Sequence, residues 1–93
     1  MATKSIMVNS SINNVYNKIR TISGYNVRLI NSNFIELSTG MTLTNWGMKY
    51  PVQLVEISPG QTQINVGVKS AHPLQFNQSA LQNECVHRIM NLF

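Results

Sequence analysis

The spacing of the hydrophobic residues changes twice along this chain of 93 residues, and this change constrains the fold most. Between residues 12 and 22 the apolar side chains recur at helical spacing. From Tyr25 to Lys69 they alternate with polar ones, as in strands with one buried face. Helical spacing returns after Ser79. With a short strand at residues 5–9, the sequence predicts the order β-α-β-β-β-β-α.

Local signals at the ends of both predicted helices agree with this order. Ser10 or Ser11 can accept a hydrogen bond from the first turn of the N-terminal helix. Gly24 can adopt the left-handed conformation that ends it. Ser79 and Gln82 have the spacing of a capping box at the start of the C-terminal helix. These signals favour two well-delimited helices.

Length and composition limit the chain to a single small domain. It has 93 residues and 43% of them are hydrophobic, which is enough for one core. Alternating strands predict an antiparallel sheet with one apolar face, and two amphipathic helices are available to cover it. We therefore expect one α+β domain over residues 1–93, with a twisted sheet of about five strands and both helices on one face.

Few residues carry charge, and this argues against most enzyme chemistry. Only 11% of the chain is charged, aspartate is absent, and the acids are Glu36, Glu56 and Glu84. General acid–base catalysis depends on such groups, so we expect a non-enzymatic protein without a cofactor. The net charge of +4 comes from scattered bases and predicts weak attraction to polyanions.

The sequence also favours a cytoplasmic protein. The N-terminal residues lack the apolar core of a signal peptide, and no apolar run reaches the length of a membrane span. The single cysteine, Cys85, cannot form an internal disulfide.

The cluster Glu-Cys-Val-His-Arg at residues 84–88 invites a catalytic or metal-binding interpretation, but helix geometry argues against it. Cys85 and His87 are two residues apart and project from different sides of a helix. Cys85 shares the apolar face with Leu81 and Ile89. Glu84 and His87 are three apart, and we expect a surface pair there and no metal site.

The segment of residues 39–47 holds the only tryptophan, Trp46, and allows three interpretations. It can form a wide loop that closes one end of the core, which we favour because aromatic residues are more often core than site. Alternatively, Met41, Leu43, Trp46 and Met48 line the mouth of an apolar groove beneath the C-terminal helix. In the third interpretation Trp46 contacts a partner chain. These four residues are our candidates for a ligand site or interface.

The same segment resembles a group of small uncharacterised bacterial domains. Residues 38–47 read S-T-G-M-T-L-T-N-W-G, and the pattern of that group is S-T-G-x-[ST]-L-x-[ST]-W-G. The resemblance implies a fold like half of the TATA-binding protein or a shortened helix-grip fold, and it implies no activity. Two departures are Asn45, where a small hydroxyl residue is expected, and Met48-Lys49, where an acid followed by a base is expected.

Two functions remain open from the sequence. The first is a binding or interaction module that forms a homodimer or holds an apolar small molecule between the C-terminal helix and the sheet. The small interior favours association. The alternative is a weak nucleic-acid binder that uses Arg28, Lys49 and Lys69 on the outer face of the sheet. We favour a solvated face over this alternative because only Phe34 and Tyr50 are available for stacking.

Overall fold

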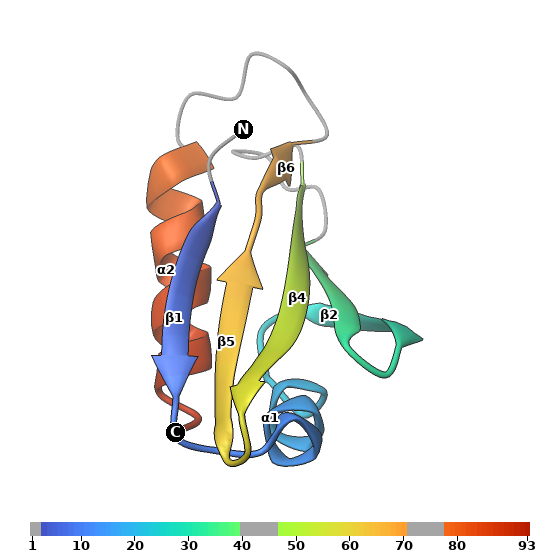
Figure 1. Cartoon of the computed structure of the whole chain (residues 1–93). Helices are drawn as coiled ribbons and strands as arrows, with labels where there is room; N and C mark the ends of the chain where they lie inside the picture. The colour runs from blue at the N-terminus through green and yellow to red at the C-terminus, as the bar shows by residue number, and fades with distance from the viewer. Residues whose placement is uncertain (1–2, 40–46, 71–77) are drawn as a thin grey trace.

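The order of helices and strands agrees with the prediction. A computed structural model describes residues 3–39, 47–70 and 78–93. The elements are β1 (Lys4–Val8), α1 (Ile12–Ile19), β2 (Asn26–Asn31), β3 (Phe34–Thr39), β4 (Met48–Ser58), β5 (Gln61–Val66), β6 (Lys69–Ser70) and α2 (Gln78–Met90). The strands form one antiparallel sheet and the fold class is α+β (Figure 1).

β4 is the central strand of the sheet. The strands lie in the order β1-β5-β4-β3-β2, so β1 and β2 are the two edges. β6 pairs with β4 and continues the register of β5, because Val66 lies opposite Val52 and Lys69 lies opposite Lys49. The sequence predicts one strand here, and the structure divides it into β5 and β6 with an interruption between them.

A proline in the central strand causes this interruption. Gly67 N donates to the Pro51 carbonyl over 2.9 Å. Proline has no N–H, so the second hydrogen bond of this pair cannot form. A Cβ atom on residue 67 would lie 3.0 Å from Pro51 Cγ, which explains why a glycine faces the ring. Because Gly67 and Pro51 approach each other closely, residue 67 is a glycine. The outer surface of the sheet therefore has no side chain at this position.

Both helices cover the same face of the sheet. Figure 1 shows the sheet from its uncovered side, so that α2 runs behind β1 and α1 lies at the lower end of the sheet. The buried apolar residues from both helices and the covered face form one core: Val15, Ile19, Ile22, Ile35, Leu37, Met48, Tyr50, Val52, Leu54, Ile64, Val66, Val68, Cys85, Val86 and Ile89. We call the uncovered side the open face. As expected from the alternation, the register places there the polar residues Arg28, Glu36, Lys49, Gln53, Gln63, Asn65 and Lys69.

α1 begins where the sequence predicts. The Ser11 hydroxyl accepts a hydrogen bond from Asn14 N over 3.3 Å, so Ser11 is the N-cap. The helix ends earlier than expected, but Ile22 remains buried because its backbone N–H bonds to Ile19 O over 3.0 Å in a following turn. Gly24 has the expected left-handed conformation, with a φ of +89°, but it does not end the helix, whose C-cap is Arg20.

α2 begins at Gln78, and Gln82 joins this helix to the sheet. The Gln82 side chain is 1% exposed and donates from Nε2 to the Val66 carbonyl over 2.9 Å. This bond connects the helix to β5. The capping box predicted for Gln82 with Ser79 stays a prediction. Among the described helices, neither has the length and apolar character to cross a membrane.

Candidate functional site: the open face of the sheet

The predicted groove beneath α2 is closed in the part of the chain that the structure describes. Cys85, Val86 and Ile89 are buried in the core against the sheet. Met48 is also a core residue, 1% exposed, and its backbone N–H bonds to Thr39 Oγ1 over 3.0 Å. Its side chain is therefore not available at a groove mouth.

The other three residues of the tryptophan segment that we singled out, Met41, Leu43 and Trp46, lie outside the described residues. Gly47, at the end of that segment, has a φ of +88°, and β4 starts directly after it. The roles predicted for these three residues stay predictions.

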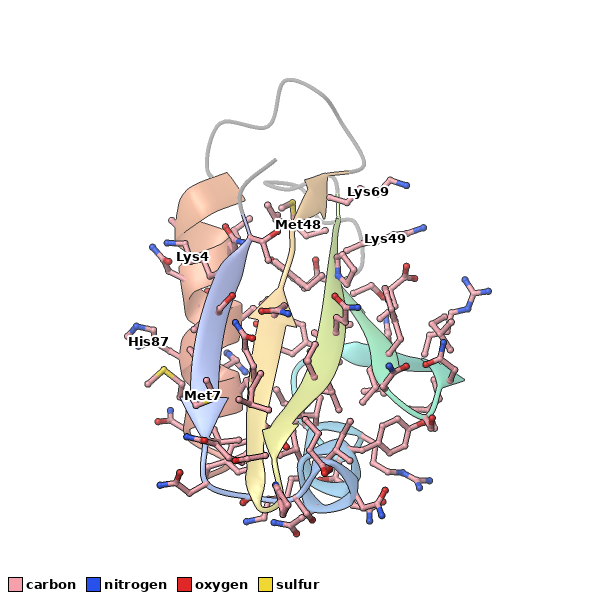
Figure 2. The ribbon with its side chains drawn as sticks, in the orientation of Figure 1. Lys4, Met7, Met48, Lys49, Lys69 and His87 are labelled. Carbon is pink, nitrogen blue, oxygen red and sulfur yellow. The ribbon has the colours of Figure 1, made fainter. Side chains whose placement is uncertain are left out.

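The basic residues of the nucleic-acid hypothesis all lie on the open face. Lys49 and Lys69 are direct neighbours across β4 and β6, and we call them the lysine pair. Figure 2 shows their side chains running towards the same side of the sheet. Arg28 lies on the edge strand, where Nη1 is 4.0 Å from Glu36 Oε1 and the side chain is 75% exposed.

Two like charges opposite each other on a sheet repel, since opposite Cβ atoms are only about 5 Å apart. In the described part of the chain, which includes all three glutamates, the ion pairs are Arg28–Glu36 and Arg88–Glu84. The lysine pair therefore has no carboxylate to balance it. An anion would relieve the repulsion.

Next to the lysine pair the open face contains a shallow hollow of about 160 Å³. The residues that line it are Thr3, Phe34, Pro51, Gln53, Asn65 and Gly67. Because residue 67 has no side chain, the ring of Pro51 and the neighbouring Phe34 can be reached from solvent between the strands. Ser5 Oγ donates a hydrogen bond to Asn65 Oδ1 over 2.6 Å. This bond orients the side-chain amide of Asn65 and leaves its nitrogen as a hydrogen-bond donor for another group.

The two aromatic residues considered for stacking lie on opposite faces. Phe34 is opposite Gln53 on the open face and is partly buried in the hollow. Tyr50 is 1% exposed and belongs to the core. The expectation that Tyr50 is available for stacking is therefore wrong. The sequence also gives no sign that a hollow forms beside Phe34. That depends on Gly67 lying opposite Pro51, which is a matter of register.

The Glu-Cys-Val-His-Arg cluster on α2 has no arrangement suited to catalysis. Cys85 is fully buried, and this burial raises the pKa of its thiol to about 11. The expected pair of Glu84 with His87 is wrong, because Glu84 Oε1 accepts from Arg88 Nη2 over 3.2 Å. Among the described residues, no group of three or more histidine, cysteine or acidic side chains is placed to hold a metal ion.

A partly buried aromatic cluster beside Cys85 was not foreseen. The rings of Tyr25 and Tyr50 meet edge to face with centroids 5.7 Å apart, and the Arg88 guanidinium lies 5.7 Å from the centre of the Tyr25 ring. Burial raises the pKa of Tyr50 to about 12, and burial followed by the nearby Cys85 raises the pKa of Tyr25 further. These protonated groups join α2 to the sheet and serve stability.

Comparisons with known proteins show a likeness in fold to solved structures but no match in sequence. The chain is similar to the Aha1 dimer from Colwellia psychrerythraea, solved in solution, with a TM-score of 0.63 and 13% sequence identity over 99% of this chain and 93% of that chain. A protein from Nitrosospira multiformis matches with a TM-score of 0.48 and 12% identity over 98% of this chain and 91% of that chain. No family model and no curated protein matches by sequence. At 13% identity the first likeness establishes the α+β fold and nothing further.

Proposed function

We propose that this protein is a non-enzymatic interaction module that forms a homodimer through the β2 edge of its sheet. The observation that supports this most is the exposure of Leu29. It points to the helix-covered face opposite Ile35, but it is 44% exposed. In Figure 1 the β2–β3 hairpin extends away from both helices, in agreement with the exposure of Leu29. A second copy of the chain would cover it.

The β2 edge offers backbone groups as well as apolar side chains. β2 ends the strand order, and one side of its backbone pairs with no other strand among the described residues. Such an edge is a template for pairing with another chain. Ile30, 46% exposed, lies where a bulge shifts the register between Leu29 and Asn31. Bulges disturb pairing, so the stretch before Ile30 is the part suited to a ladder.

A two-fold axis at Val27 gives a self-complementary arrangement of this stretch. In that antiparallel register, Leu29 lies opposite Tyr25 of the second copy on the covered face. Arg28 lies opposite Asn26 of the second copy, so no like charges meet. A stable interface normally buries about 1,200–2,000 Å². Because this ladder is short, we expect a dimer that dissociates on dilution.

The fold likeness is consistent with this proposal. The similar structure from Colwellia psychrerythraea is described as a dimer. The alternative of an apolar ligand held between α2 and the sheet has less support, since Cys85 and Ile89 fill that space among the described residues.

Sedimentation velocity over a concentration series tests the proposal. Wild-type protein should shift from monomer to dimer as its concentration rises. Leu29→Lys should stay monomeric with an unchanged far-UV circular dichroism spectrum, because this side chain is already partly in solvent. Met7→Lys is the matched control, since Met7 is 49% exposed on the opposite edge strand (Figure 2). A dimer that persists in Leu29→Lys, or a wild-type monomer at every concentration, would contradict the proposal.

A further inference from the structure

We propose that the open face binds a nucleoside monophosphate unit, with the base in the hollow and the phosphate on the lysine pair. This site is separate from the β2 edge and does not depend on dimer formation. The argument rests on the size of the hollow, the chemistry of its lining and the unbalanced charge beside it.

The size of the hollow limits the ligand to one ring system. Sites for drug-sized molecules measure roughly 300–1,000 Å³, whereas this hollow measures about 160 Å³. It is open to solvent on the face of the sheet, so it cannot enclose a long apolar chain. A flat ring resting on the surface is the shape that fits.

The lining of the hollow suits a ring with a polar edge. Phe34 and Pro51 provide apolar surface, and an aromatic side chain is the usual platform on which a base stacks. Gln53 and Asn65 bring amide groups to the same hollow. Amides offer both donors and acceptors, as the edge of a base requires. A purely hydrocarbon ring could not bond to the amide nitrogen of Asn65, whose oxygen is already bonded to Ser5.

The lysine pair supplies the charge that a phosphate needs. Lys49 is two residues from Pro51 on β4, and Lys69 is two residues from Gly67, all with side-chain positions on the open face. Two residues along a strand span about 7 Å, so the ammonium groups can reach an anion attached to a ring in the hollow. No carboxylate competes for the lysine pair, as described above.

Free nucleotides and single-stranded nucleic acid share this chemistry, and titration distinguishes them. The probes are AMP, adenosine, inorganic phosphate and a six-nucleotide oligo(dA), followed by the amide shifts of uniformly ¹⁵N-labelled protein. We expect AMP to shift the amides around Phe34, Gln53 and Lys69 more strongly than adenosine or phosphate does. Binding of oligo(dA) tighter than AMP identifies the strand as the source. Equal or weaker binding of oligo(dA) identifies the free nucleotide.

Three variants make the test specific. Lys49→Gln with Lys69→Gln should weaken AMP binding roughly tenfold, since each exposed charge pair contributes up to about 1 kcal/mol. Phe34→Leu keeps an apolar side chain and should weaken AMP and adenosine alike. Arg20→Gln is the matched control, because Arg20 is exposed at the end of α1 on the other face. Absence of AMP and oligo(dA) binding, or equal affinity in the lysine variant, overturns the proposal.

Discussion

Replacing Gly67 by alanine should destabilise the protein because of Pro51, and a double-mutant cycle can measure this directly. The new Cβ would lie 3.0 Å from Pro51 Cγ, whereas carbon atoms normally pack about 3.5–4.0 Å apart. Overpacking of this kind costs roughly 1–3 kcal/mol. Loss of glycine freedom in the unfolded chain returns roughly 0.4–1 kcal/mol. We therefore expect a net loss of about 1 kcal/mol, or a fall of about 4–8 °C in Tm.

Pro51→Ala should be close to neutral alone. It supplies an N–H that can bond to the Gly67 carbonyl, with a gain of roughly 0.5–1.5 kcal/mol. It also loses the stiffness of proline in the unfolded chain, a cost of roughly 0.4–1 kcal/mol. With both substitutions the clash disappears. The double variant should be more stable than the sum of the single changes predicts, by about 1–2 kcal/mol.

Urea unfolding followed by far-UV circular dichroism measures the four free energies of unfolding. All variants must be compared at one protein concentration, because dimer formation would make stability depend on concentration. If the two substitutions are additive within about 0.5 kcal/mol, the close contact of this pair does not limit residue 67, and the reasoning is wrong.

Three further outcomes are expected from the same measurement. Gln82→Leu leaves the Val66 carbonyl without its partner and should cost at least about 1 kcal/mol. Because burial raises the pKa of Cys85 from 9.0 to about 11, the contribution of its neutral thiol to stability should be fully present below pH 9 and be lost as the pH rises towards 11. Cys85→Ala should remove most of the fall in stability between pH 9 and 10. Ser11→Ala removes the hydrogen bond from Asn14 N and should lower the free energy of unfolding by roughly 0.5–1 kcal/mol. Ser11→Gly should lower it by only about 0.3 kcal/mol. A flat alkaline profile, or neutral effects of either helix substitution, would contradict these assignments.

Alternation predicted the composition of the open face well. Arg28, Lys49 and Lys69 were assigned to it from the period-two pattern, and the register confirms the assignment. The same pattern assigned Leu29 inwards. Its direction is as expected, but whether a helix reaches far enough to cover it depends on the placement of α1 and α2, which the pattern of one strand does not contain.

Long-range partners were harder to predict. Gln82 has the spacing of a capping residue, and nothing in that spacing shows that its side chain also reaches Val66 on β5. Ser5 and Asn65 are hydrogen-bonded across 60 residues of sequence, because β1 pairs with β5 at one edge of the sheet. Side-chain spacing in one element carries no information about which strand from another part of the chain lies beside it.

The sequence by itself determined the order of elements, the α+β class and the division of each strand into a core side and a solvent side. These follow from local periodicity, because neighbouring residues in a strand or helix must point in fixed directions. Only the tertiary structure decided that Gly67 lies opposite Pro51, that Lys69 lies opposite Lys49 and that Leu29 is left uncovered. These depend on strand order and register, which are set by the packing of the whole core.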